Sequence, residues 1–113
     1  MNTHLVDGGF TAKIILRDCD LISLTSITHS HWLVLHLADI LGMTAVGELV
    51  TRQIPPGLSV GLVIAESHIF LHTWPESASL RLIIDSCVDF DITLAVETVK
   101  DAYETDEAEV VII

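Results

Sequence analysis

The centre of the chain most restricts the fold, because it holds four consecutive strand-like segments between two helix-like segments. Short apolar runs rich in β-branched side chains indicate strands, and turn residues such as Pro55-Pro56-Gly57 separate them. Strands grouped between helices in this way favour an α+β arrangement over a doubly wound sheet. The four expected strands cover Thr44 to Gln53, Leu58 to Ala65, His68 to Trp74 and Leu80 to Ser86.

The flanking segments carry apolar side chains at helical spacing. Leu21 to Leu41 shows one such stripe, and Ile92 to Tyr103 shows another. Phe10 to Arg17 and Glu109 to Ile113 indicate two further strands. The element order is then β-α-β-β-β-β-α-β. The 113 residues fit a single α+β domain, and we expect a two-layer α/β sandwich with a largely antiparallel sheet and two helices.

The charge of the chain limits its partners. Asp and Glu number 16 against 5 Lys and Arg, which gives a formal net charge of −11. Phosphate contacts require basic side chains, so we expect no nucleic-acid partner. An acidic protein suits a small cationic substrate, although such a charge also simply keeps a chain soluble. Because half of the residues are hydrophobic, we also expect apolar surface reserved for a second subunit.

Cellular location is indicated by what the sequence lacks. No stretch approaches the roughly 20 apolar residues of a membrane span. The segment Met1 to Gly9 lacks the charged start and apolar run of a signal peptide. Cys19 and Cys87 are too few for a disulfide framework and form no CxxC pair. We therefore expect no membrane association and a cytoplasmic location, where thiols stay reduced.

The segment from Glu66 to Glu76 predicts chemistry. It reads Glu-Ser-His-Ile-Phe-Leu-His-Thr-Trp-Pro-Glu, and most of it lies in an expected strand. Polar side chains placed among buried strands are costly unless they have a function. A single serine at a strand turn would carry no such meaning, so the interpretation depends on the spacing of other residues around it.

That spacing resembles the processing and active-site signature of the bacterial and archaeal type of S-adenosylmethionine decarboxylase, a pyruvoyl-dependent family. The family's self-cleavage site, a Glu-Ser bond, corresponds to Glu66-Ser67. Ser59 lies eight residues before Ser67 and matches the processing serine, and His72, five residues after it, matches the processing histidine. Cys87 lies twenty residues after Ser67, where the family has its catalytic cysteine.

The resemblance implies a self-processing reaction. The Ser67 hydroxyl would attack the Glu66 carbonyl, with Ser59 and His72 supporting the adduct and moving its protons. The ester formed in this way would then break at the Ser67 α-carbon. The products would be a β chain of residues 1–66 and an α chain of residues 67–113 that begins with a pyruvoyl group.

The resemblance also implies a decarboxylase of polyamine and spermidine biosynthesis. Its cofactor would be the pyruvoyl group derived from Ser67, with no pyridoxal phosphate and no metal. The ketone would form a Schiff base with the substrate amine and accept the electrons left as CO₂ departs. Cys87 would donate a proton to the substrate carbon, Glu76 would lie near the ligand, and Trp74 would wall the pocket. The expected assembly is a homodimer of processed αβ protomers.

The chain departs from the family where the substrate is recognised. The aromatic residue expected to stack on adenine aligns near Gln53, and Tyr-Gly-Tyr is replaced by Ser77-Ala78-Ser79. Other departures are Thr11 and Ile15, in place of a histidine and an acidic residue, and Val60 and Val88, in place of glycines.

Three hypotheses about function follow. One is an S-adenosylmethionine decarboxylase with a different adenine site. Another is a family member that decarboxylates L-ornithine or L-arginine, whose distal charge Asp85 or Glu76 would bind. The last is an inactive regulatory homologue, against which the presence of Ser59, Ser67, His72 and Cys87 argues.

The remaining cysteine and histidines have simpler interpretations. Cys19 is by default a buried cysteine. The role of His68 stays open, because neighbouring strand residues face opposite ways. His29, His31 and His36 lack the i, i+4 pairing of a helical metal site, so we expect core or surface positions for them and no metal.

Overall fold

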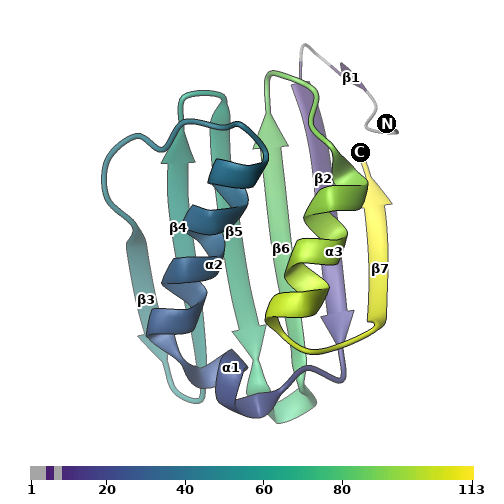
Figure 1. Ribbon diagram of the computed structural model, residues 1–113. Helices are drawn as coiled ribbons and strands as arrows, with labels where there is room; N and C mark the ends of the chain where they lie inside the picture. The colour runs from purple at the N-terminus through teal and green to yellow at the C-terminus, as the bar shows by residue number, and fades with distance from the viewer. Residues whose placement is uncertain (1–4, 7–8) are drawn as a thin grey trace.

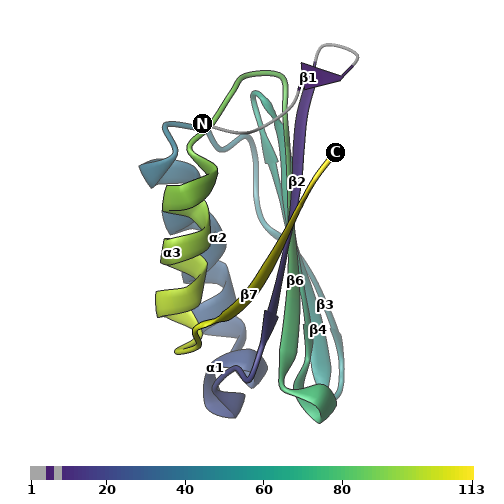
Figure 2. The same ribbon diagram turned by 90° about the vertical axis from the view of Figure 1, so that its right-hand side faces the viewer.

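The chain folds into two layers, a twisted sheet and a layer of helices on one of its faces (Figure 1, Figure 2). The computed structural model describes residues 5–6 and 9–113. Seven strands form the sheet in the order β1-β2-β6-β5-β4-β3, with β7 also paired to β2, and paired strands run antiparallel. The predicted α+β sandwich is confirmed. The strands are β1 (Leu5–Val6), β2 (Gly9–Arg17), β3 (Val50–Ile54), β4 (Gly57–Ile64), β5 (Ser67–Trp74), β6 (Ser79–Ser86) and β7 (Glu107–Ile112).

The helical layer contains α1 (Leu21–Thr25), α2 (Ile27–Ile40) and α3 (Ile92–Ala102), and a single 3-10 turn, η1 (Pro75–Ser77), follows β5. The prediction of one continuous helix from Leu21 to Leu41 is wrong at Ser26.

Ser26 has extended backbone angles, and its hydroxyl accepts a hydrogen bond from the His29 N–H at 3.1 Å. Its own N–H donates to the Ser23 carbonyl, so this one residue ends α1 and caps α2.

The first of the four central strands is shorter than predicted. It begins at Val50 instead of Thr44, and the residues before it form a loop that pairs with the sheet at one isolated bridge, between Ala45 and Ile64. Gly42 and Gly47 both have positive φ, a conformation that breaks extended structure and that glycine adopts without strain. β1 was not predicted, and the other strands agree with the predicted segments to within two residues.

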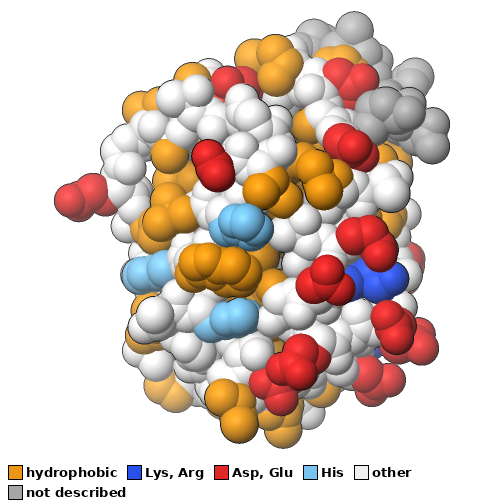
Figure 3. Space-filling model, viewed as in Figure 1, with side chains coloured by type: hydrophobic (Ala, Val, Ile, Leu, Met, Phe, Trp, Pro, Cys, Tyr) orange, Lys and Arg blue, Asp and Glu red, His pale blue; other side chains and the backbone are white. Residues whose placement is uncertain are grey.

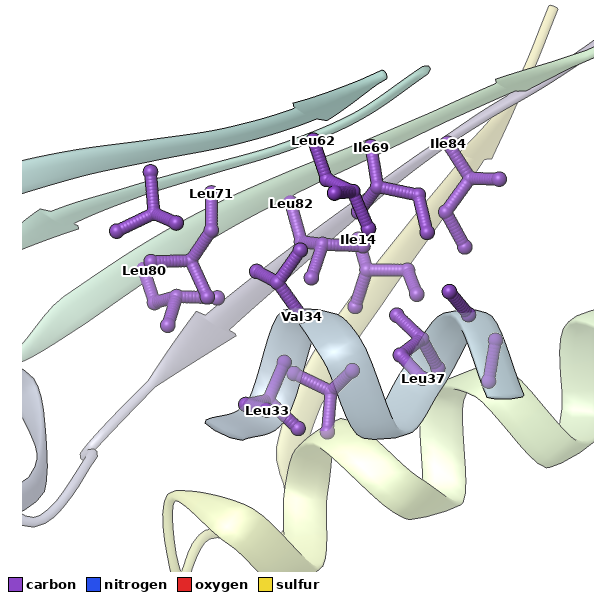
Figure 4. Packing of buried hydrophobic residues seen from close by; sticks show 14 of the residues in the cluster. Ile14, Leu33, Val34, Leu37, Leu62, Ile69, Leu71, Leu80, Leu82 and Ile84 are labelled. Carbon is purple, nitrogen blue, oxygen red and sulfur yellow. The ribbon is translucent and has the colours of Figure 1, made fainter. Parts of the chain in front are cut away.

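Side chains from alternate strand positions form the core beneath the helices (Figure 4). Ile14 lies opposite Leu82, and Leu62 lies opposite Ile69, in register across neighbouring strands. Leu33, Val34 and Leu37 of α2 pack onto this surface, and all of these side chains are fully or almost fully buried. This apolar alternation fixes the register, because a slip of one residue would turn every core side chain outward.

The opposite face of the sheet, which we call the open face, has no helix over it (Figure 2). Side chains at the strand positions that do not face the core point to the open face. The open face carries four of the five basic side chains in the sequence, against three acidic side chains on the same strands. The basic ones are Lys13, Arg17, Arg52 and Arg81, and the acidic ones are Asp85, Glu107 and Glu109.

Further acidic side chains lie on the helical side. Figure 3 shows that side of the molecule, with Asp and Glu side chains gathered around α3. Asp91, Glu97, Asp101 and Glu104 are among the residues on or next to this helix.

Within residues 5–6 and 9–113, no helix is both long and apolar enough to cross a membrane. The expectation about Met1 to Gly9 concerns residues that lie mostly outside those the structure describes.

Candidate functional site

Ser67 is the first residue of β5, directly after the tight turn that leaves β4. It pairs with Ile64 on one side and with Ser86 on the other, so neighbouring strands hold its backbone. Its hydroxyl donates a 2.9 Å hydrogen bond to Oδ2 of Asp85. The same oxygen lies 3.2 Å from Nδ1 of His68. The Ser67 hydroxyl is thus in contact with two groups that can accept its proton.

Asp85 joins β2 to β5 on the open face. It lies in register with Thr11 on one neighbouring strand and with His68 on the other. The Thr11 hydroxyl donates to Oδ1 at 2.7 Å. This hydrogen bond is the largest cause that holds the pKa of Asp85 below its ordinary value; partial burial opposes it, and the Ser67 hydroxyl and His68 add to it. Asp85 is therefore a carboxylate at neutral pH.

Glu66 and Cys87 meet at the same end of the sheet. The Cys87 backbone N–H donates a 2.8 Å hydrogen bond to the Glu66 carbonyl oxygen, which belongs to the Glu66-Ser67 peptide bond. The Glu66 side chain accepts from the Thr44 N–H at 3.1 Å. The Cys87 thiol is free and exposed. A peptide carbonyl held by an N–H donor is polarised toward attack, and here the neighbouring residue carries the hydroxyl.

Cys19, by contrast, is buried in the core. Burial, with Asp18 nearby, raises the pKa of its thiol to about 11, so it stays a thiol at neutral pH. Its interpretation as a buried cysteine is confirmed.

Ser59 and His72 form a second polar group on the open face. They lie opposite each other on β4 and β5, and Oγ of Ser59 is 2.8 Å from Nδ1 of His72. Burial, followed by the positive charge of Arg81, lowers the pKa of His72. The imidazole is therefore neutral at neutral pH, and its Nδ1 can accept a proton from the Ser59 hydroxyl.

This pair lies far from Ser67 within one chain. His72 follows Ser67 by five residues on the same strand, and extended strand rises about 3.3 Å per residue, so roughly 16 Å separates them. The sequence led us to expect that Ser59 and His72 support the adduct at Ser67. The structure brings the pair together, but it does not bring it to Ser67 of the same chain.

A cavity of about 300 Å³ adjoins the Ser59–His72 pair. Trp74 and Glu76, both expected at the ligand, line it together with Arg52, which sequence reasoning missed. The Arg81 guanidinium stands over the Trp74 ring, 5.2 Å from its centroid. Asp85, the other carboxylate expected to hold a distal charge, does not line this cavity and touches Ser67.

The polar side chains of β5 are not buried as the sequence argument assumed. Four side chains of β5 alternate with the core residues and point to the open face, where they are half-buried or exposed. They are those of His68, Phe70, His72 and Trp74. Thr73 is buried, but its hydroxyl accepts from the Leu58 N–H at 3.1 Å. The placement of His68, which the sequence left open, is thereby decided: it lies beside Asp85 on the open face.

The helix histidines make structural contacts. His29 lies 2.6 Å from the Ala102 carbonyl through Nε2, His31 contacts Thr51, and His36 stacks on Trp32. In the part of the chain that the structure describes, no three metal-ligating side chains are grouped closely enough to hold an ion.

Both the sequence and the fold are similar to those of known proteins. The family model described as S-adenosylmethionine decarboxylase matches residues 14–113. An S-adenosylmethionine decarboxylase proenzyme of Clostridium botulinum (strain Loch Maree / Type A3) is 32% identical over 80 residues, which cover 71% of this chain and 69% of the relative. A proenzyme of Fervidobacterium nodosum is 33% identical over 95 residues, covering 83% of this chain and 69% of the relative.

The fold has a counterpart among solved structures. The crystal structure of the adenosylmethionine decarboxylase from Aquifex aeolicus superposes with a TM-score of 0.80, covering 91% of this chain and 86% of the other. The two sequences are 19% identical, so this likeness speaks for the fold alone.

Proposed function

The chain belongs to the S-adenosylmethionine decarboxylase family, and on that premise we propose that it is a pyruvoyl-dependent decarboxylase that forms its cofactor by cutting itself between Glu66 and Ser67. One observation carries the proposal. The carbonyl of the Glu66-Ser67 bond accepts the Cys87 N–H, while the adjacent Ser67 hydroxyl is bound to Asp85. A polarised carbonyl and a hydroxyl with a proton acceptor are the two partners that an acyl shift from nitrogen to oxygen requires.

The position of the bond suits a cut that leaves the fold intact. It follows the turn between β4 and β5, so neither product loses part of a strand. The β chain, residues 1–66, would keep β1 to β4 with α1 and α2. The α chain, residues 67–113, would keep β5 to β7 with α3. Pairing of β4 with β5 and of β2 with β6 and β7 joins the two products.

The residues around Ser67 also fit the group that replaces it. A pyruvoyl group supplies an electrophilic ketone that withdraws electrons from the substrate as CO₂ leaves. The Cys87 thiol, which is free and exposed at the same end of the sheet, donates the proton that the substrate carbon takes up. The Asp85 carboxylate gives this end of the site a negative charge, which suits a substrate that approaches with its ammonium group.

S-adenosylmethionine is the proposed substrate, because the family acts on it, and the proposed role is in polyamine biosynthesis. A specific observation also favours a smaller basic amino acid, L-ornithine or L-arginine. Gln53 offers no ring for adenine, and Arg81 already stands over the ring of Trp74. Within the 300 Å³ cavity, Arg52 and Glu76 provide one charge of each sign, which suits the two ends of an amino acid.

A homodimer completes the site. Ser59 and His72 are about 16 Å from Ser67 of their own chain, so they act on Ser67 of a second copy. The open face supports such an assembly, since Val63, Phe70 and Trp74 are exposed on it. Its basic and acidic side chains nearly balance, so two open faces can meet without the repulsion that a net charge of −11 would otherwise cause.

The proposal is tested by intact mass and by CO₂ release. The purified chain should separate under denaturing conditions into fragments 1–66 and 67–113, and the second should lack a free amino group at its start. Ser67→Ala should stay whole. The processed protein is then supplied with S-adenosylmethionine, L-ornithine and L-arginine in parallel. A parent chain that remains whole after long incubation contradicts self-processing. A cut chain that releases no CO₂ from any of the three would favour the inactive homologue.

A further inference from the structure

Asp85 is the carboxylate nearest to the hydroxyl that must lose a proton. Self-cleavage begins when the Ser67 oxygen attacks the Glu66 carbonyl carbon, and that oxygen has to give up its hydrogen as the new bond forms. The hydrogen already points to Oδ2 of Asp85 at 2.9 Å. The histidine of the distant Ser59–His72 pair is not available to this hydroxyl within the chain.

The sheet holds the Asp85 carboxylate in this orientation from two sides. Thr11 on β2 and His68 on β5 are its direct cross-strand neighbours. The 2.7 Å hydrogen bond from Thr11 occupies Oδ1, which leaves Oδ2 for Ser67. Thr11 and Ser67 lie 74 and 18 residues from Asp85 in sequence. Contacts among three strands thus hold one oxygen of Asp85 against the reacting hydroxyl.

From these contacts we propose that Asp85 is a catalytic base of self-cleavage, oriented by Thr11. The inference rests on the proposed function and names the group that accepts the first proton of self-cleavage. The proton of the Ser67 hydroxyl passes to Oδ2 of Asp85 while Oγ bonds to the Glu66 carbonyl carbon. The Cys87 N–H stabilises the negative oxygen of the adduct. The C–N bond then breaks, and the proton returns from Asp85 to the Ser67 nitrogen, which leaves an ester and a free amine.

The charge state of Asp85 agrees with this role. Its pKa lies below the ordinary value, chiefly because of Thr11, so the proton acceptor is present throughout the neutral range. The titratable side chain facing it is His68, whose Nδ1 is 4.0 Å away, while Thr11 and Ser67 contribute hydroxyls. A carboxylate is a weak base, but each chain cuts itself only once, so a slow step suffices.

His68 is the competing base, because its Nδ1 lies 3.2 Å from the same hydroxyl. Substitution separates the two candidates, because His68→Gln removes the imidazole and leaves Asp85 in contact with the Ser67 hydroxyl.

The test follows the first step alone. Full-length chain is made in a short cell-free synthesis, and cutting is followed by intact mass in the presence of hydroxylamine, which cleaves an ester as soon as it forms. Trapped product consists of residues 1–66 as a hydroxamate and residues 67–113 with a free serine amine. Asp85→Asn keeps the shape of the side chain and removes its negative charge. Asp39→Asn, on the exposed side of α2, is the matched control.

We expect Asp85→Asn to slow ester formation at least ten-fold and Asp39→Asn to leave it unchanged. His68→Gln should form the ester within two-fold of the parent rate. Asp85→Ala should be equally slow and should recover on addition of formate, which replaces the missing carboxylate.

Two results would overturn the assignment. One is Asp85→Asn cutting within two-fold of the parent. The other is His68→Gln cutting as slowly as Asp85→Asn, which assigns the proton to His68. His68→Gln decides even if the Asp85 variants fail to fold. In both cases the parent still cuts itself and Ser67→Ala does not, so the proposed function stands. A parent that forms no ester at all refutes the proposed function instead.

Discussion

The Ser59 hydroxyl lies 2.8 Å from Nδ1 of His72, yet the two side chains are about 16 Å along the sheet from Ser67. Their hydrogen bond crosses from β4 to β5, so strand pairing holds the geometry of the pair. The sheet therefore carries two separate polar groups, which are the two halves of the proposed site. One half contains the Glu66-Ser67 bond, and the other contains a neutral histidine with a hydroxyl partner.

If two copies join these halves, a defective histidine in one chain should be rescued by the other. We expect His72→Ala to cut slowly on its own. In mixed dimers with Ser67→Ala, the His72→Ala chain should be cut, because its partner supplies His72. Intact mass identifies each chain. The control partner carries both substitutions and should give no rescue. Mixed dimers in which the His72→Ala chain stays whole would show that the pair does not act across subunits.

The pKa of His72 should depend on Arg81. Burial is the larger cause of its lowered pKa and Arg81 the second, so Arg81→Gln should raise the pKa part of the way toward the ordinary histidine value. An NMR titration of the uncut Ser67→Ala chain measures this. Arg17→Gln is the matched control, because Arg17 pairs with Glu109 at 2.9 Å. An unchanged His72 titration in Arg81→Gln would refute the electrostatic contribution.

Cys87 should matter for turnover but not for the cut. Its backbone N–H, which alanine retains, contacts the Glu66 carbonyl, whereas the thiol is free. Cys87→Ala should therefore still yield both fragments, while CO₂ release falls about 10² to 10⁴-fold, the usual loss for a proton donor. Cys19→Ala, in the core, should change neither. Loss of cutting in a folded Cys87→Ala protein would mean that the thiol itself takes part in processing.

Stability should fall at high pH because of Tyr103. Burial raises the pKa of this side chain to about 12, from an ordinary 10.0. Above pH 10 the unfolded chain loses this proton while the folded chain keeps it, so unfolding becomes more favourable as pH rises toward 12. A shift of two units corresponds to roughly 2 to 3 kcal/mol.

Urea unfolding at pH 8 and pH 11 measures the effect. The buried Cys19, with its pKa raised to about 11, adds to the loss from about pH 9 upward. Tyr103→Phe should lose the hydrogen bond to Ser30 and should show a shallower decline with pH. An equal decline in parent and variant would contradict the assignment to Tyr103.

Ser26 should contribute to stability as a helix cap. Its hydroxyl accepts the His29 N–H at the start of α2, so Ser26→Ala should lower the free energy of unfolding by about 1 kcal/mol. Ser26→Asn, which can cap in the same way, should lose much less. Chemical denaturation of the uncut Ser67→Ala chain avoids effects of processing. Equal stability of the alanine and asparagine variants would show that the cap does not stabilise the fold.

Much of the fold could be predicted from local sequence. The apolar runs on either side of Pro55-Pro56-Gly57 and of Glu66-Ser67 are β-strands, and the stripe in Ile92 to Tyr103 is a helix. The errors came where a single residue outweighs a periodic pattern. Ser26 caps a new helix inside an unbroken apolar stripe. Gly47, with its positive φ, interrupts the predicted strand before β3 begins.

The sequence likewise predicted only part of the candidate site. Spacing along the chain identified Ser59, Ser67, His72 and Cys87 as a set, because a family signature is a property of sequence. Spacing does not say which members touch. Ser59 meets His72 because their strands pair in that register, and the same register keeps both from Ser67.

The sequence by itself thus determined most of the strand and helix segments and the residues that match the family signature. Only the tertiary structure decided that Asp85 contacts Ser67 and Thr11. The physical reason is that strand register is set by burial of the core face, over separations as long as 74 residues. The polar partners on the open face follow from that register, and no local pattern in the chain specifies them.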